Sequence, residues 1–385
     1  MSPNLGAVIP GLSDEWKHPS QTSTVLTLVG PDVIRSALAQ LAGTPVTPTA
    51  FSFGWVAYAF SNLITTLNGG TLMPQPEIPC LVINANNGYE FVLSSGPLID
   101  VLSSNRRDNH SWIIARILRD FQYWAHPDVT QKVKQIVDAA REDDRRKERN
   151  VNVPRRNKAG LCISVYSCSR PAGKPVHDFV YYSGFIIALL QLAISSIPFG
   201  ISGDWVPFLL TFFGIVLAFT TGALPHWKEE KWEAPLSKKR VILTRGNGAQ
   251  HAIVIDSEKG GVDFEALAAL EPTASLATRI GNVTLAVLWI VHLITLAEVD
   301  RDAWYLIAVG SIGMAYNVYV AGVHRRPAAL GIHLDYIECF ADRKVMRALQ
   351  AVETKNLGVG TSMLPTFFPG ELRPEEQSFW DKQKK

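Results

Sequence analysis

Four long stretches of the chain carry no charged side chain. Each has at least 18 residues, and a helix of that length approaches the roughly 30 Å thickness of a bilayer's hydrocarbon core. The stretches cover residues 179–201, 205–224, 280–297 and 303–322. One such stretch is compatible with a buried helix of a large soluble protein. Four stretches in two closely spaced pairs instead predict a mainly α-helical membrane protein with four transmembrane helices arranged as two hairpins.

Basic residues predict how these helices are oriented. Lys and Arg are concentrated in residues 141–174, in residues 225–279 and at Arg325 and Arg326, whereas the loop 202–204 has none and the loop 298–302 has one. Under the positive-inside rule the three basic segments face the cytoplasm. Both chain termini are then cytoplasmic. The expected location is the endoplasmic reticulum, another endomembrane or the plasma membrane.

The remaining sequence is polar enough to fold outside the bilayer. The pattern divides the chain into five regions. They are a cytoplasmic α/β region (1–160), a first transmembrane hairpin with its lead-in (161–224), a structured cytoplasmic loop (225–279), a second transmembrane hairpin (280–322) and a cytoplasmic tail (323–385). Short runs of β-forming residues predict strands, and amphipathic spacing predicts a helix over 111–124. The predicted strands cover residues 80–84, 161–166, 241–244 and 252–255.

Three further local features have distinct interpretations. Gly246-Asn247-Gly248 predicts a hairpin between the last two of those strands. Asn86-Asn87-Gly88 predicts a turn. The tail has a helical pattern over 335–355. It is followed by an aromatic and proline-rich segment that we expect to be ordered but irregular, with a position along the membrane surface as one interpretation.

The segment 51–67 is ambiguous because it is apolar and aromatic but interrupted by Gly54. One interpretation is a fifth transmembrane span. The preferred interpretation is a helix that packs in the cytoplasmic domain or lies at the membrane surface.

Composition narrows the function classes. The chain of 385 residues is 47% hydrophobic and 19% charged, with a net charge of +2 and four cysteines. Ordinary soluble domains carry about 25% charged residues. These values exclude a largely disordered chain and a disulfide scaffold, and they give no support for nucleic-acid binding. The expected partners are the lipid bilayer and cytoplasmic proteins.

Histidines are the main candidates for chemistry, since we find no standard catalytic or nucleotide-binding motif and no cofactor signature. His292 is the ionisable residue well inside a predicted span, where such groups are costly. The conservative interpretation is a neutral imidazole hydrogen-bonded to a neighbouring helix, for example to Gln191, Thr220 or Asn317. The alternative is a role in proton transfer or substrate binding.

A second group of histidines lies at the predicted cytoplasmic ends of the spans. His177, His226 and His324 are candidate metal ligands, because imidazole and carboxylate are common donors. His226 and Glu229 share a helical spacing and are candidate acid–base residues together with His292. Ordinary interfacial residues would give the same pattern.

Several segments resemble a group of multi-pass membrane proteins of filamentous fungi that have no assigned mechanism. The resemblance rests on FSFGWVAYAFSNL, GALPHWKEEKW, LTRGNGAQHAIVI and LPTFFPGELRPEEQSFW. It implies a fungal origin and an association with secondary metabolism, and it transfers no catalytic residue.

Three functions are therefore compatible with the sequence. The first is a non-catalytic accessory or scaffolding protein that holds partners at a membrane. The second is a membrane-embedded enzyme that acts on an apolar small molecule, such as a prenylated or polyketide intermediate. The third is an oligomeric channel or transporter, for which four spans are few and no inverted repeat is evident.

Overall fold

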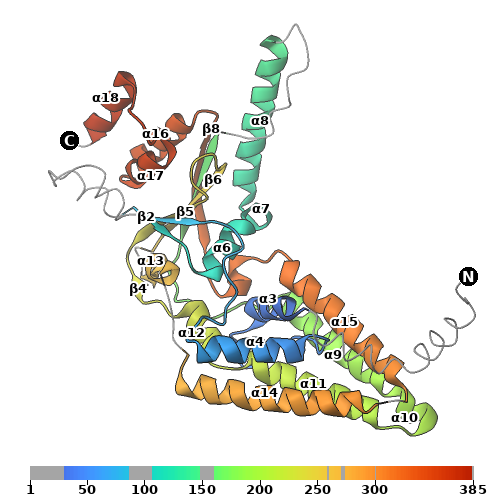
Figure 1. Ribbon diagram of the computed structural model, residues 1–385. Coiled ribbons are helices and arrows are strands. Elements are labelled where there is room, and N and C mark those ends of the chain that lie inside the picture. Colours follow the sequence, from blue (N-terminus) through green and yellow to red (C-terminus); the bar gives the residue numbers. More distant parts are fainter. Residues whose placement is uncertain are drawn as a thin grey trace, which may run out of the picture. The chain divides into compact units, whose positions relative to one another are not determined.

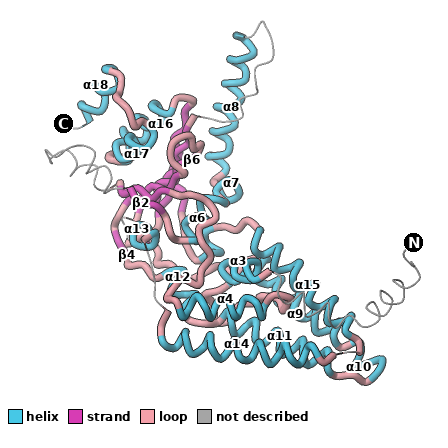
Figure 2. The backbone as a smooth tube through the Cα atoms, in the orientation of Figure 1, coloured by secondary structure: helices cyan, strands magenta, loops and turns pink. Residues whose placement is uncertain are grey.

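The computed structural model describes residues 30–85, 106–147, 160–257, 260–269, 274–299 and 301–383 (Figure 1). The protein is mainly helical (58%) and has a mixed six-stranded sheet (Figure 2). It divides into two compact units, each assembled from three separate stretches of chain. The helical unit comprises the described parts of Met1–Pro74, Val176–Lys231 and Glu271–Val323. The mixed unit comprises those of Gln75–Pro175, Trp232–Leu270 and His324–Lys385.

The helical unit is built from apolar helices that pack side by side. In chain order they are α3 (Pro31–Leu41), α4 (Trp55–Leu67), α9 (Phe179–Ser195), α10 (Ile197–Ser202), α11 (Val206–Gly222), α12 (His226–Trp232), α14 (Leu276–Ala297) and α15 (Ala303–Gly322). Helix α14 packs on α4 and α11, and α15 packs on α3 and α9. The predicted hairpins are therefore in mutual contact.

Three helical segments are long and apolar enough to cross a membrane: α9 continued by α10, α14 and α15. Helix α11 has 17 residues and reaches the required length only together with α12, across a bend of 41°. The prediction of long apolar helices is thus confirmed for three spans, and for four if the bent pair forms one span.

Residues 51–67 contain helix α4, which narrows the interpretations of this segment. The 13 residues of the helix extend about 20 Å, which is too short to cross the hydrocarbon core. It also does not pack in the α/β domain. The buried face of α4, which includes Trp55, Tyr58 and Asn62, packs against α14, so residues 30–74 belong to the helical unit.

The mixed unit contains the six-stranded sheet. Its strand order is β2 (Arg106–Asp108), β1 (Leu81–Asn84), β5 (Arg240–Thr244), β6 (His251–Asp256), β3 (Leu161–Ser167) and β8 (Asp335–Asp342). Strands β3 and β6 are parallel, and the other neighbours are antiparallel. The antiparallel β5–β6 pair confirms the predicted hairpin. A separate two-stranded sheet pairs β4 (Leu236–Ser237) with β7 (Gly261–Val262).

Helices of 4 to 21 residues complete the mixed unit. They are α6 (Trp112–Arg119), α7 (Phe121–Trp124), α8 (Pro127–Lys147), α13 (Phe264–Ala268), η3 (Pro327–Leu330), α16 (Val345–Lys355), α17 (Val359–Phe367) and α18 (Pro374–Gln383). One core lies between the sheet and the C-terminal helices, where Ile163 and Val254 pack with Leu349, Met363 and Trp380.

The C-terminal tail differs from its prediction in two ways. Residues 335–342 form strand β8 instead of a helix, because pairing with β3 satisfies their backbone groups, and the helix begins only at Val345. The segment expected to be irregular contains the end of α17 and most of α18, joined by the non-helical residues 368–373. Its aromatic side chains Phe367 and Trp380 are buried in the core under the sheet rather than lying at a membrane surface. The predicted turn at 86–88 lies outside the described residues.

Candidate functional site

A non-helical segment passes through the interior of the helical unit between α3 and α4. Its residues Thr47, Thr49 and Ala50 are fully buried. Two glycines allow neighbouring helices to approach its backbone. A Cβ at Gly184 of α9 would lie 2.0 Å from the Pro48 carbonyl oxygen, and a Cβ at Gly313 of α15 would lie 1.8 Å from that of Phe51. We call residues 47–54 the buried segment.

Amide side chains from the apolar helices satisfy the backbone of the buried segment. Gln191 Nε2 donates to the carbonyl oxygens of Phe51 (2.5 Å) and Val309 (2.9 Å). Asn317 Nδ2 donates to the carbonyl oxygen of Ala50 and to Ser52 Oγ, both at 3.0 Å. Non-helical backbone is tolerated in an apolar interior only where such partners are present. The polar residues of the spans therefore have a structural role that the sequence pattern alone did not show.

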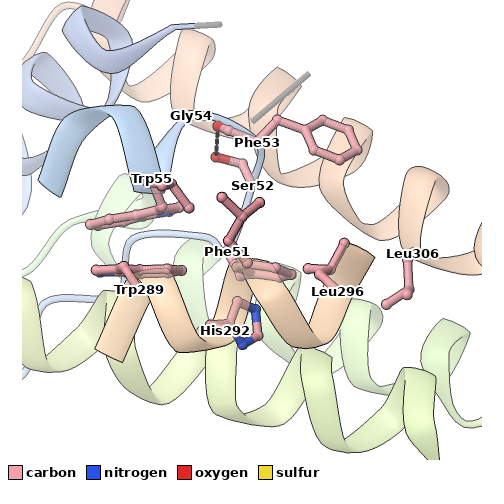
Figure 3. Close-up of a pocket in the computed structure, with 11 residues that line it drawn as sticks. Phe51, Ser52, Phe53, Gly54, Trp55, Trp289, His292, Leu296 and Leu306 are labelled. Atoms are coloured by element: carbon pink, nitrogen blue, oxygen red, sulfur yellow. Dashed lines mark hydrogen bonds between the residues drawn. The ribbon is translucent and has the colours of Figure 1, made fainter. Parts of the chain in front are cut away.

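Aromatic rings beside this segment line a small pocket (Figure 3). The Trp55 and Trp289 rings stack at a centroid distance of 5.3 Å and an interplanar angle of 9°. Phe51 lies parallel to Trp289 at 6.3 Å. The imidazole of His292 meets the Phe51 ring edge-on at 5.4 Å and the Trp289 ring at 5.6 Å. Leu296 and Leu306 complete an almost entirely apolar lining.

His292 is, with Trp289, one of two side chains at this pocket that have a buried ring nitrogen without a hydrogen-bond partner among the described residues. It is only 6% exposed, and its Nε2 atom has no hydrogen-bond partner among the described residues. The three expected partners are engaged elsewhere: Gln191 and Asn317 bond the buried segment, and Thr220 donates to the carbonyl oxygen of Val216. No described acidic or basic side chain hydrogen-bonds His292, so the surroundings of its imidazole are aromatic and aliphatic.

The candidate acid–base pair His226 and Glu229 does not form a contact in the described structure. His226 is 1% exposed and lies against the Trp227 ring at 4.8 Å, and neither of its ring nitrogens has a partner among the described residues. The neighbouring Glu230 is the carboxylate with a clear task. It accepts hydrogen bonds from the backbone N–H groups of Leu72 (2.8 Å) and Met73 (2.7 Å).

The candidate metal ligands are engaged separately. His177 of the helical unit stacks on Tyr181 at 3.9 Å. His324 belongs to the mixed unit, where its Nδ1 atom lies 2.8 Å from Asp120 Oδ1. Within the described residues, no group of three or more His, Cys, Asp or Glu side chains is placed to hold a metal ion.

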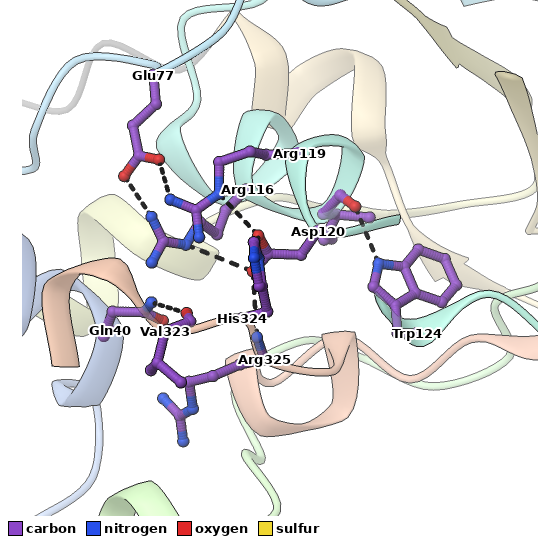
Figure 4. Close-up of polar contacts among 10 residues, drawn as sticks. Gln40, Glu77, Arg116, Arg119, Asp120, Trp124, Val323, His324 and Arg325 are labelled. Carbon is purple, nitrogen blue, oxygen red and sulfur yellow. Dashed lines mark hydrogen bonds and ion pairs between the residues drawn. The ribbon is translucent and has the colours of Figure 1, made fainter. Parts of the chain in front are cut away.

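The partner of His324 belongs to a buried charge network in the mixed unit (Figure 4). The fully buried Asp120 carboxylate accepts hydrogen bonds from Arg119 Nε (2.7 Å) and from the backbone N–H of Arg325 (3.1 Å). It also forms an ion pair with Arg116, which is paired with Glu77 as well. Burial lowers the pKa of the Arg116 guanidinium to about 10, against the opposing effect of Glu77. In the sequence, the i, i+4 spacing of Arg116 and Asp120 on a predicted helix could have indicated this ion pair.

His251 gives the mixed unit a predicted pH dependence. Its ring packs on Phe121 at 5.1 Å, and burial, aided by the nearby charge of Arg245, lowers the pKa of His251 to about 4. The folded state thus binds fewer protons than the unfolded state, whose His pKa is about 6.5. Stability is retained above pH 6.5 and falls by about 2–3 kcal/mol as the pH drops toward 4.

This prediction can be checked by comparing denaturant unfolding of the wild type and of His251→Gln at pH 7.5 and 4.5. Hydrogen exchange at β3 and β6 would report on the mixed unit alone. We expect the variant to lose less stability on acidification than the wild type. An equal loss in both proteins would assign the acid sensitivity to other groups.

The chain was compared with family models, with curated proteins and with solved structures, and none of the three comparisons gives a match. Function must therefore be argued from the geometry described above.

Proposed function

We propose that the protein is a multi-pass integral membrane protein with a non-catalytic accessory role. In this proposal the helical unit lies in a bilayer and the mixed unit lies in the cytoplasm, where it holds partner proteins at the membrane. The proposal includes an association with fungal secondary metabolism, and the sequence resemblance is the sole support for that association.

The distribution of apolar and polar side chains on the long helices carries this proposal. Outward-facing residues are large and apolar, for example Leu189 of α9, 68% exposed, and Ile294 of α14, 60% exposed. Polar residues of the same helices, such as Gln191 and Asn282, are buried. A soluble protein has the opposite arrangement, and exposed apolar surface is strongly unfavourable in water. A hydrocarbon environment suits this surface.

The sheet supports the proposed topology. Its strands come from the stretch before α9, from the stretch between α12 and α14, and from the stretch after α15. Strands of one sheet must lie on the same side of a membrane. Each hairpin therefore crosses the bilayer twice or not at all, which agrees with the positive-inside assignment of the three basic segments.

An accessory role fits the candidate catalytic residues better than catalysis does. General acid–base chemistry uses groups within hydrogen-bond reach of each other or of a substrate. Among the described residues, neither His292 nor His226 hydrogen-bonds a carboxylate. A protein that holds partners at a membrane needs only a folded unit attached to a membrane anchor. In this proposal the mixed unit is the folded unit and the helical unit is the anchor.

Membrane insertion can be tested on tagged full-length protein expressed in a eukaryotic host. We expect it to stay in the pellet after extraction at high pH in carbonate and to be released by mild detergent. Protease added to the cytoplasmic side of sealed vesicles should cut in the segment 236–262, whereas protease on the lumenal side should not. Recovery in the detergent-free supernatant would contradict the proposal.

The accessory role needs a separate experiment. The tagged chain would be purified in mild detergent together with any protein bound to it. We expect a partner in stoichiometric amount, and the tagged partner should in turn co-purify the chain. Deletion of the gene with metabolite and lipid profiling tests the enzymatic alternative. Accumulation of a single precursor that disappears again with wild-type protein but not with His292→Ala would favour an enzyme.

A further inference from the structure

We propose that the buried segment and α4 together enter the bilayer from the cytoplasmic side, turn near its middle and return to the same side. The outward face of α4 then contacts lipid acyl chains. We call residues 47–67 the re-entrant element. The inference deepens the proposed function, because it rests on the helical unit lying in a membrane. It does not depend on the accessory role.

One short helix, α12, holds the chain on both sides of the re-entrant element. The Lys231 Nζ atom donates to the carbonyl oxygen of Ala42, shortly before the element, at 3.1 Å. The Glu230 carboxylate accepts from the backbone N–H groups of Leu72 and Met73, shortly after the element. The element therefore begins and ends on the same side of the helical unit. In the proposed topology this side is cytoplasmic, because α12 follows the cytoplasmic end of α11.

The buried segment leads from the cytoplasmic end of the helices to their middle. Thr47 Oγ1 donates to the carbonyl oxygen of Gly222, the last residue of α11. The carbonyl oxygen of Phe51 lies against Gly313 of α15, and the Phe51 ring lies against Gly214 of α11. These two glycines are roughly 12–14 Å from the cytoplasmic ends of their helices. Phe51 is thus near the middle of a hydrocarbon core of about 30 Å.

Helix α4 leads back to the cytoplasmic side alongside α14 (Figure 1). At the start of α4, Trp55 stacks on Trp289. Near its end, Asn62 and Thr66 form hydrogen bonds with Asn282 at 3.0 and 2.8 Å. Residue numbers rise along α4 as they fall along α14, so the two helices are antiparallel. Because α14 runs away from the cytoplasm in the proposed topology, α4 runs back toward it.

The two halves of the re-entrant element differ in the way that a bilayer requires. Every residue of the non-helical half, 47–54, is buried. Non-helical backbone at membrane depth is tolerated only where protein surrounds it. The helical half satisfies its own backbone groups and can face lipid. Its outward face consists of Phe60, Ile64 and Leu67, and Ile64 is as exposed as Ile294 of α14, both at 60%.

Acyl chains are the occupant that the position of this face favours. Helix α4 carries no charged side chain that could pair with a polar partner. Its neighbour α14 exposes Val283 and Val287 close to Asn282, which α4 contacts. A lipid that covers one of these helices therefore also reaches the other. A second copy of the protein is the competing occupant, and reagent accessibility distinguishes the two.

Modification of single cysteines tests whether the element begins and ends on one side. Val46 and Asn68 are exposed and flank it, and the four native cysteines are buried. In sealed vesicles, a membrane-impermeant maleimide on the cytoplasmic side should modify Val46→Cys and Asn68→Cys fully. The same reagent on the lumenal side should modify neither. Ser202→Cys at the exposed end of α10 is the control, for which we expect the opposite pattern. The wild type measures the background.

Spin labels test whether α4 contacts lipid, in full-length protein in phosphatidylcholine nanodiscs. The label is attached to Ile64→Cys, to Val283→Cys on the exposed face of α14, and to Asp138→Cys on the exposed surface of α8. The measured quantity is the ratio of collisions with oxygen, which concentrates among acyl chains, to collisions with a water-soluble nickel chelate. We expect the ratio at Ile64 to match that at Val283 and to exceed that at Asp138.

Three results would overturn the inference while leaving the membrane location of the helical unit intact. Modification of Val46→Cys and Asn68→Cys from opposite sides would mean that residues 47–67 cross the bilayer. A ratio at Ile64 like that at Asp138, with Val283 still lipid-like, would place α4 outside the bilayer. Low accessibility of Ile64 to both reagents would mean that protein covers α4.

A fourth result would act on the proposed function itself. If the label at Val283 also behaved like that at Asp138, the helical unit would not lie in a membrane, and both proposals would fall together. A chain that shows the expected accessibility but co-purifies no partner would refute the accessory role and leave the re-entrant element intact.

Discussion

Gly313→Ala should prevent the helical unit from folding correctly. The added methyl group would lie 1.8 Å from the Phe51 carbonyl oxygen and 2.7 Å from Gln191 Nε2. Relief requires a shift of the buried segment, which is held by Gln191 and Asn317. Overpacking of a core costs about 1–3 kcal/mol when side chains can adjust. Here a backbone atom is in the way, so we expect at least the upper end of that range.

The measurement for Gly313→Ala is the amount of monodisperse protein recovered in detergent and its midpoint of thermal unfolding. Gly322→Ala is the matched control, because it lies at the end of the same helix and a Cβ there meets no atom within 4 Å. We expect the control to match the wild type. If Gly313→Ala gave wild-type yield and stability, the close packing of the buried segment against α15 would be wrong.

The apolar helices were predictable because their signal is local. A stretch such as 280–297 carries its own hydropathy, and the helix α14 that contains it was expected within a few residues. The buried segment was not predictable in this way. The stretch 51–67, which overlaps it, is apolar on both sides of Gly54, and this pattern fits a span, a packed helix or a surface helix equally well. Only the positions of Gly184, Gly313, Gln191 and Asn317 reveal what surrounds it, and these residues are distant in the sequence.

The sheet shows the same division between local and distant information. Strands β5 and β6 follow from one hairpin signal in a short stretch. Strand β8 does not, because Asp335–Asp342 becomes a strand through pairing with β3, which lies more than 160 residues earlier. The helical spacing in its sequence was a weaker influence than that pairing. Tertiary contacts often override local preference for strands.

The candidate site was predicted in part. His292 was identified from its depth in an apolar stretch, and the structure places it at a pocket. Its expected hydrogen bond to a neighbouring helix is absent from the described residues, and the amide nitrogens of Gln191 and Asn317 donate to the buried segment instead. Phe51 and Trp55 were not connected with His292 by the sequence. Phe51 reaches His292, and Trp55 stacks on Trp289, because α4 packs against α14 and Phe51 lies just before α4.

Asp120→Ala should destabilise the mixed unit strongly. The Asp120 carboxylate is fully buried and holds four groups: Arg116, Arg119, His324 and the backbone N–H of Arg325. Removing one partner of a buried ion pair costs about 3–5 kcal/mol, because the remaining charge stays desolvated. Arg116 keeps Glu77 but loses its ion-pair partner 3.6 Å from Nε, and the N–H of Arg325 loses its hydrogen-bond acceptor. The decrease in the free energy of unfolding should exceed the decrease caused by removing one partner of an exposed ion pair.

The exposed pair Arg141 and Asp138 on α8 provides the comparison for this network. Its side chains are 43% and 53% exposed, and exposed ion pairs contribute at most about 1 kcal/mol. Asp138→Ala should therefore leave the unfolding midpoint in denaturant nearly unchanged, whereas Asp120→Ala should lower it sharply. Hydrogen exchange at α6 and β3 assigns the effect to the mixed unit. Equal effects of the two substitutions would mean that the buried network does not stabilise the segment that follows α15.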